Sequence, residues 1–256
     1  RGEILQLFAD HVHGGMPDPW VETRVEVFDE DRNALGGRAI RRQTRLRFGA
    51  GNRSPTLDVL LYLPSAATAG AVPVFLGLNF FGNHSVHADP GIRLSTAWMR
   101  TSPDQGIVDN RATEASRGSL ASRWPVEQIL ARGYGLATIY CGDLDPDFDD
   151  GYTNGVHPLF YRSGQSRPEP HEWGTLGAWA WGLSRGLDVL QQDPDVAATR
   201  VAVMGHSRLG KTALWAGACD ERFALVISNN SGCGGAALAR RRFGETVAII
   251  NKAFPH

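Results

Sequence analysis

The stretch VAVMGHSRLGK, residues 201–211, passes from an apolar run into a turn between two glycines. The apolar run at 201–204 is typical of a short buried strand, and 208–217 is predicted to be a helix. Ser207 lies in the turn between them. A serine at a sharp strand-to-helix turn exposes its hydroxyl at the edge of a sheet, where it can act as a nucleophile. The stretch therefore predicts an α/β fold and makes Ser207 the first catalytic candidate.

The turn departs from the G-x-S-x-G pattern of such nucleophiles at one position. Gly205 stands two residues before the serine, but Leu209 stands two after it and Gly210 comes one residue later. Small residues are usual at both positions because the strained turn leaves little room for a side chain. The pattern alone is equally compatible with an ordinary turn and a helix-capping serine. The interpretation therefore depends on the surrounding sequence.

Apolar runs and helical periodicities alternate around this turn. Buried strands are predicted at residues 72–80, 136–140, 201–204 and 223–228. Helices are predicted between them, at residues 125–132, 175–191 and 208–217. Such alternation predicts right-handed crossovers and a parallel sheet covered by helices. Ser207 would follow the third of these strands, at the carboxyl edge where such sheets carry their sites.

Together these elements predict a three-layer α/β-hydrolase sandwich with a mostly parallel central sheet. Residues 21–28 and 58–63 are predicted to be antiparallel edge strands, and 85–120 a long surface insertion. A length of 256 residues with 42% hydrophobic content suits a single catalytic domain over residues 1–256. An α/β-hydrolase sheet normally continues with two more strands, and none is clear after residue 228. We therefore expect a C-terminally incomplete domain, completed by a second polypeptide or a missing C-terminal segment.

Composition argues against several classes of function. The net charge is −1, with no long run of one sign, which favours neither a nucleic-acid nor an anionic-membrane partner. No apolar run reaches the length of a membrane span. The aspartate-rich run at 143–150 resembles a calcium loop, but Asn154 replaces the glutamate that such a loop needs. We predict no metal and no cofactor, and interpret this run as a solvated loop near the site.

Two basic residues follow the serine on its predicted helix. Arg208 begins the helix, so its amide could stabilise negative charge on an attacked carbonyl, and its side chain could add a donor or remain solvated. Lys211 lies four residues after Ser207, on the same helix face. It could reach a polar group of a substrate, or it could be a surface lysine paired with Asp220 or Glu221. The residues themselves leave these alternatives open.

Three motifs stand out along the chain, GHSRLGK at 205–211, WAWG at 179–182 and SGCGGAA at 231–237, with weaker ones at 142–147 and 79–82. In these motifs the chain resembles a known family, the glucuronoyl esterases of carbohydrate esterase family fifteen, and is most similar to its bacterial members. The resemblance implies cleavage of esters between 4-O-methyl-glucuronic acid on xylan and lignin alcohols, through a serine–acid–histidine triad without a cofactor. A secreted or periplasmic enzyme is expected.

The resemblance also implies roles for individual residues. It makes Ser207 the nucleophile and Arg208 an oxyanion stabiliser. It makes Lys211 a donor to sugar hydroxyls and Glu245 a second side chain that binds the sugar. Members with the acid on the strand after the serine carry it directly before the Ser-Gly of the SGCGG segment, but here that residue is Asn230. An asparagine cannot neutralise an imidazolium, so the acid is expected on a later strand.

The catalytic histidine is also missing from the expected place. His84, His87 and His157 precede the serine, whereas α/β-hydrolases order their triad serine, acid, histidine. These three are predicted to contact substrate or to lie on the surface. The only histidine after the serine is the terminal His256, for which no strand end is predicted. We expect the histidine and the acid to lie beyond residue 256.

Two other functions remain open at this stage. One is an acetyl-xylan or feruloyl esterase, against which Lys211 and Glu245 argue because hydroxyl-binding side chains favour a uronate over an acetyl group. The other is a catalytically inactive carbohydrate-binding relative, which Asn230 and the missing histidine would suit.

Overall fold

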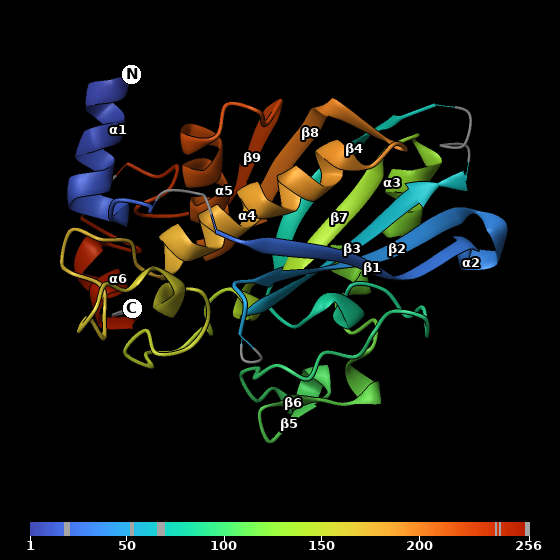
Figure 1. Ribbon diagram of the computed structural model, residues 1–256, viewed down its shortest axis with the longest axis horizontal. Helices are drawn as coiled ribbons and strands as arrows, with labels where there is room; N and C mark the ends of the chain where they lie inside the picture. The colour runs from blue at the N-terminus through green and yellow to red at the C-terminus, as the bar shows by residue number, and fades with distance from the viewer. Residues whose placement is uncertain (18–20, 52–53, 66–69, 239, 241, 254–256) are drawn as a thin grey trace.

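The computed structural model describes residues 1–17, 21–51, 54–65, 70–238, 240 and 242–253. Within these residues a seven-stranded sheet runs in the order β1-β2-β3-β7-β4-β8-β9 (Figure 1). Its strands are β1 (Thr23–Asn33), β2 (Ala39–Phe48), β3 (Thr56–Pro64), β4 (Val72–Asn79), β7 (Gly135–Tyr140), β8 (Val196–His206) and β9 (Leu225–Asn229).

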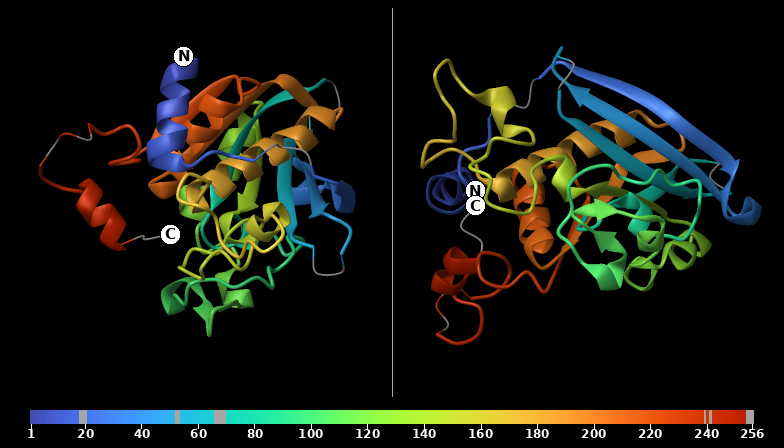
Figure 2. Two further views of the ribbon diagram at one scale, coloured as in Figure 1. Left: turned by 60° about the vertical axis from the view of Figure 1, so that its left-hand side comes forward. Right: turned by 90° about the horizontal axis from the view of Figure 1, so that it is seen from below.

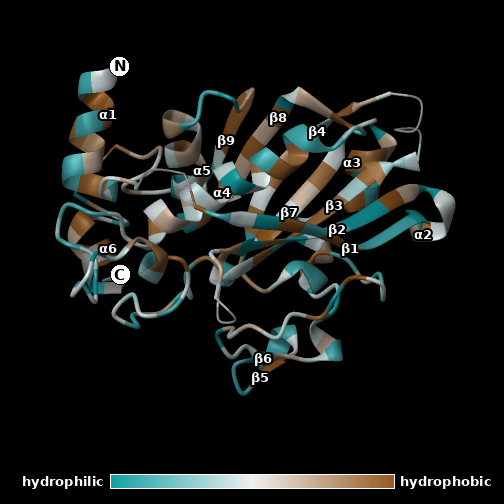
Figure 3. Ribbon diagram, in the orientation of Figure 1, coloured by the Kyte–Doolittle hydropathy of each residue, from teal (hydrophilic) through white to brown (hydrophobic). Residues whose placement is uncertain are grey.

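The strands β7, β4, β8 and β9 are parallel, as the alternation of apolar runs and helices predicted. The connecting helices are α3 (Val126–Ala131), α4 (Thr175–Gln192) and α5 (Arg208–Cys219). Helices α4 and α5 share one hydrophobic cluster with the sheet, and α3 packs on β3 and β7 in a second cluster. Apolar residues run along the central strands between these layers (Figure 3). The predicted three-layer α/β sandwich is confirmed.

The sheet is less parallel than predicted, because β1, β2 and β3 add three antiparallel pairings. Strand β2 was not predicted, because its sequence AIRRQTRLRF contains four arginines. Most of its side chains are nevertheless buried. Burial is possible because acidic side chains pair with the two most buried arginines, Arg41 and Arg42. The acidic partners are Asp29, Asp31 and Asp89 for Arg41, and Glu30, Asp193 and Asp195 for Arg42.

The long insertion at residues 85–120 is more than a surface loop. It contains a small hairpin of β5 (Ile107–Val108) and β6 (Arg111–Ala112), which lies below the sheet in Figure 1. Apolar side chains along it are fully buried and fix it to the body of the protein. These are Val86, Ile92, Met99 and Ile107.

The remaining helices lie at the periphery. They are α1 (Gly2–Phe8), α2 (Ala34–Gly37) and α6 (Val247–Ala253). Helix α6 stands to one side of the sheet in both views of Figure 2. Strand β9, within the fourth predicted strand at 223–228, is the outermost strand beside β8, and it exposes Leu225 and Ile227. None of the described helices has both the length and the apolar character needed to cross a membrane.

Candidate active site

Ser207 occupies the sharp turn between β8 and α5. Its backbone has φ 58° and ψ −126°, a conformation that residues other than glycine rarely adopt. A Cβ atom at Gly205 would lie 2.0 Å from the carbonyl oxygen of Leu209, so only glycine fits there. The amide of Ser207 donates a hydrogen bond of 3.0 Å to the carbonyl of Asn229, at the end of β9. The start of α5 and the end of β9 therefore both constrain the strained turn.

The geometry of the turn explains its departure from the usual pattern. Leu209 is buried in the hydrophobic core, so a large side chain is accommodated at this position. The close approach occurs at Gly210, where a Cβ atom would lie 3.0 Å from Ser231 Cβ and 3.1 Å from the Asn229 carbonyl oxygen. A small residue is therefore required at position 210, one residue further along the helix than in the usual pattern.

Arg208 is held in place rather than solvated. Its Nη2 donates a 2.5 Å hydrogen bond to Oδ2 of Asp147, and its side chain is 22% exposed. The guanidinium carbon also lies 5.2 Å from the centre of the Phe80 ring. Asp147 follows β7 and Phe80 follows β4, so loops after two other strands fix this side chain at the end of β8. Its backbone amide begins α5, where helix N–H groups have no partner within the helix.

The aspartate-rich run is not the solvated loop that the sequence analysis predicted. Asp145 and Asp147 are only 1% and 9% exposed. Asp145 accepts a 2.6 Å hydrogen bond from Thr175, and its carboxylate lies 3.3 Å from Nδ1 of His157. No cluster of three or more potential metal ligands occurs in the described part of the chain. Asp147 was not predicted as a site residue, although its place in the loop that follows a predicted buried strand was a signal.

Of the three histidines predicted to contact substrate or to lie on the surface, His84 and His157 are not at the surface, and His87 is partly buried. His84 and His157 are fully buried, and Nε2 of His84 lies 2.8 Å from the Ser116 hydroxyl. His206 is exposed beside Asn229. Among the described residues, no imidazole forms a hydrogen bond with the Ser207 hydroxyl. His256 lies outside the described residues.

Lys211 and Glu245, 34 residues apart, meet beside α5. Lys211 is 3% exposed, and its Nζ lies 3.4 Å from Oε2 of Glu245 rather than beside Asp220 or Glu221. The same oxygen accepts a 3.0 Å hydrogen bond from the amide of Cys233. The alternative of a surface lysine is therefore wrong. The structure brings the two predicted sugar-binding residues together.

The segment after β9 carries no carboxylate at the position that the resemblance marks. Asn230 has a φ of 46° and is exposed. Ser231 turns inward, and its hydroxyl accepts a 2.8 Å hydrogen bond from the amide of Ala236. A Cβ atom at Gly232 would lie 1.9 Å from Oε2 of Glu245, so glycine is needed for this contact. The turn presents Glu245 toward Lys211 and leaves the catalytic acid unassigned among the described residues.

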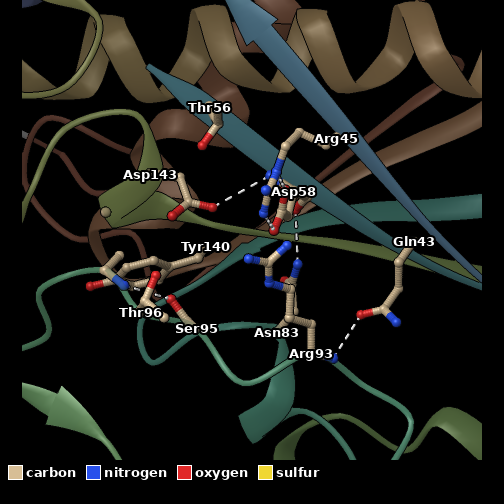
Figure 4. Close-up of a pocket in the computed structure, with 12 residues that line it drawn as sticks. Gln43, Arg45, Thr56, Asp58, Asn83, Arg93, Ser95, Thr96, Tyr140 and Asp143 are labelled. Carbon is tan, nitrogen blue, oxygen red and sulfur yellow. Dashed lines mark hydrogen bonds and ion pairs between the residues drawn. The ribbon is translucent and has the colours of Figure 1, made fainter. Parts of the chain in front are cut away.

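Two cavities adjoin the loop that carries Asp147, and Gly142 and Asp143 line both. One, of about 310 Å³, is lined mainly by polar side chains (Figure 4). The other, of about 910 Å³, has apolar walls that include Trp98 and Phe148, whose ring centres lie 4.4 Å apart. Burial and the nearby Asp58 carboxylate raise the pKa of Asp143 to about 8. Asp143 is therefore mostly protonated at neutral pH.

Comparison with known proteins gives consistent matches. Residues 160–248 match the family model described as glucuronyl esterase, fungi. A carbohydrate esterase named MZ0003, from an unknown prokaryotic organism, is 53% identical over 100% of this chain, which covers 59% of that protein. The solved structure of a promiscuous CE15 esterase from a marine bacterial metagenome is 52% identical with a TM-score of 0.90, over 100% of this chain and 63% of that one.

A glucuronoyl esterase from Solibacter usitatus is 48% identical with a TM-score of 0.92, over 100% of this chain and 64% of that structure. The chain thus spans between 59% and 64% of the length of these relatives.

Proposed function

This chain belongs to carbohydrate esterase family 15, the glucuronoyl esterases, and on this premise we propose that it carries the nucleophile of a serine esterase. Its substrate is the ester that joins 4-O-methyl-glucuronic acid on xylan to a lignin alcohol. The observation that carries the proposal is the strained backbone of Ser207, with φ 58°, at the start of α5. Strain of this kind exposes a nucleophilic hydroxyl at the edge of a sheet.

In the proposed reaction, the Ser207 hydroxyl attacks the carbonyl carbon of the uronate ester. The lignin alcohol leaves, an acyl-enzyme forms, and water then releases the uronic acid. The Arg208 amide and guanidinium stabilise the negative charge that develops on the carbonyl oxygen. The contacts of Arg208 with Asp147 and Phe80 support this role, because donors that are already oriented need not reorganise during the reaction.

Lys211 and Glu245 bind the hydroxyl groups of the uronoyl ring in this proposal. Their contact of 3.4 Å is long for a charge-assisted hydrogen bond, which typically spans about 2.7–2.9 Å. A sugar hydroxyl can accept from the ammonium and donate to the carboxylate, so one group satisfies both partners. An acetyl ester has no hydroxyl on its acyl side. This pair therefore favours a glucuronoyl over an acetyl ester.

The polymeric substrate also suggests where the protein works. Glucuronoxylan joined to lignin cannot cross a cell membrane, so the proposed enzyme acts in a secreted or periplasmic location. The chemistry of a serine esterase requires no cofactor.

Hydrolysis of matched esters tests the proposal. We expect the protein to cleave benzyl glucuronate with a higher kcat/KM than it shows for 4-nitrophenyl acetate or methyl ferulate. Ser207→Ala should abolish turnover, whereas Ser163→Ala, at an exposed loop serine, should retain it. A preference for the acetyl or feruloyl ester would contradict the substrate. Glycan binding without turnover in the wild-type protein would identify an inactive carbohydrate-binding relative.

A further inference from the structure

The polar cavity of about 310 Å³ takes no part in the reaction proposed above. Its volume is close to the lower end of the range for ligand pockets, roughly 300–1,000 Å³, which suits a ligand about the size of one sugar ring. Strand β2, the start of β3, the insertion and the loop after β7 all contribute to its lining (Figure 4). With Asn83, which follows β4, residues from five separate segments thus converge on one small space.

Two arginines and two aspartates line the cavity. Arg45 and Asp58 neutralise each other through two hydrogen bonds of 2.7 Å and 2.6 Å. Arg93 is exposed at the cavity, and within the described residues its guanidinium forms no ion pair with a carboxylate. The remaining carboxyl of the lining, Asp143, has a pKa raised to about 8 and is mostly uncharged at neutral pH, so an anionic ligand can neutralise Arg93.

The position of Arg93 is fixed by the fold. Its backbone amide donates a 2.9 Å hydrogen bond to Oε1 of Gln43 on β2. Its guanidinium carbon lies 5.5 Å from the centre of the Phe28 ring, which also faces Arg45 at 5.3 Å. A cation–π contact of this kind orients an arginine without using its hydrogen-bond donors. Arg93 is therefore presented to the cavity with its donors available.

Uncharged hydrogen-bonding groups lie beside this cation. Thr56, Ser95 and Thr96 contribute hydroxyls to the lining. Burial and Asp58 raise the pKa of Asp143 to about 8, so this carboxyl is mostly protonated at neutral pH. A protonated carboxyl both donates and accepts hydrogen bonds, and it does not repel an anion. One cation surrounded by such groups is complementary to a carboxylate on a ring that bears hydroxyls.

The cavity and the serine belong to the same edge of the sheet. Asp143 follows β7 and Ser207 follows β8, with β4 between these two strands. Neighbouring strands lie about 4.8 Å apart, so two strand spacings separate the positions by about 10 Å. That separation exceeds the width of one sugar ring, so each position would hold a different residue of one glycan.

From these observations we infer that the cavity is a second carbohydrate subsite, which binds a free uronate through Arg93 and the hydroxyls of its ring through Asp143 and its neighbours. The inference rests on the proposed function only in identifying the ligand as part of the same glycan. The ester under attack at Ser207 is uncharged, whereas a uronate elsewhere on the glycan carries the charge that Arg93 recognises.

Titrations followed by NMR test the subsite, with sodium glucuronate as the probe and methyl xyloside as the neutral comparison. Glucuronate should shift the amide signals of residues 93–97 and 143. Arg93→Gln should weaken this binding by about tenfold or more, because it removes charge-assisted hydrogen bonds. Arg111→Gln is the matched control, since it removes an exposed arginine of the same insertion that does not line the cavity. It should leave the affinity unchanged.

Two further measurements separate the subsite from the reaction. Arg93→Gln should leave kcat and KM for the small ester benzyl glucuronate unchanged, because this substrate cannot span both positions. Lys211→Ala should leave the shifts at residues 93–97 intact. The subsite is overturned if Arg93→Gln retains full affinity, if methyl xyloside binds as tightly as glucuronate, or if Lys211→Ala abolishes these shifts. Absence of esterase activity would contradict the proposed function alone, because the titration requires no turnover.

Discussion

Asp147 and Arg208 are joined by a 2.5 Å hydrogen bond between the Oδ2 carboxylate oxygen and the Nη2 nitrogen. The two residues are 61 positions apart, so this contact ties the loop after β7 to the turn that carries Ser207. Asp147 is buried, and charge-assisted hydrogen bonds are stronger where water is excluded. Asp147 is therefore placed to orient the guanidinium of Arg208 and is a positioning residue in the proposed reaction.

Arg208→Ala is expected to lower kcat for a glucuronate ester by on the order of 10²-fold, the typical effect of removing one donor to the oxyanion. KM should change little, because the interaction forms in the transition state. Steady-state kinetics of the variant measures both constants, with Arg111→Ala as a control for the loss of an exposed arginine. An unchanged kcat would leave only the backbone amide in the mechanism.

Asp147→Asn should lower kcat by less than Arg208→Ala does, since the guanidinium remains but is less firmly oriented. The double variant should be no slower than Arg208→Ala alone, because Asp147 acts through Arg208. A double-mutant cycle on kcat measures this coupling. Additive losses would show that Asp147 acts by another route.

Lys211→Ala should raise KM for glucuronate esters far more than for 4-nitrophenyl acetate, because in the proposed complex the lysine contacts sugar hydroxyls that the acetate lacks. The exposed Lys252 on α6 provides a matched control. Equal losses on both substrates would refute the role in sugar binding. Such a result would leave Lys211 as a structural partner of Glu245.

The parallel half of the fold could be predicted because its strands are continuous apolar runs separated by periodic helices. Strand β7, for example, is buried at every position. Strand β2 could not be predicted in the same way, since its buried arginines look like surface residues until their partners are known. Those partners come from distant segments, such as Asp193, which lies 151 residues from Arg42. Sequence periodicity carries no information about such long-range pairing.

The same contrast between local patterns and long-range contacts applies to the residues of the candidate site. The sharp turn at Ser207 could be predicted because a turn motif is local, and Lys211 could be proposed as a site residue because helix spacing relates it to the serine. The contact between Lys211 and Glu245 is long-range, and the family resemblance pointed to Glu245 where spacing could not. Asp147 was missed because a run of aspartates favours a solvated loop by composition. Its burial follows from packing against elements that the local sequence does not identify.

Arg42→Ala is expected to destabilise the protein by about 3–5 kcal/mol, the usual cost of removing one partner from a buried ion-pair network. Glu30, Asp193 and Asp195 would lose their shared counterion between β1, β2 and the start of β8. Denaturant unfolding at neutral pH measures the change. The exposed Arg24 on β1 is the control, and Arg24→Ala should change stability by less than about 0.5 kcal/mol. Similar values for the two variants would contradict the importance of the network.

His13 should make the protein less stable in mild acid. Burial lowers the pKa of this imidazole to about 4, whereas the unfolded chain should titrate near the ordinary value of 6.5. Between these two values the unfolded state binds a proton that the folded state does not. The contribution of neutral His13 is therefore fully present above pH 6.5 and is lost progressively as the pH falls toward 4. At pH 5 the expected loss is about 2 kcal/mol relative to pH 7.

His13→Phe isolates this effect, because a phenyl ring can keep the contact with Trp215, whose ring centre lies 4.7 Å from that of His13. The free energy of unfolding should fall less between pH 7 and pH 5 in this variant than in the wild-type protein. Some of the fall should remain, since burial also lowers the pKa of His84 to about 4. His11→Gln, at an exposed position of the same segment, should retain the wild-type pH dependence. If His13→Phe loses as much stability as the wild-type protein over this range, His13 does not titrate as its burial requires.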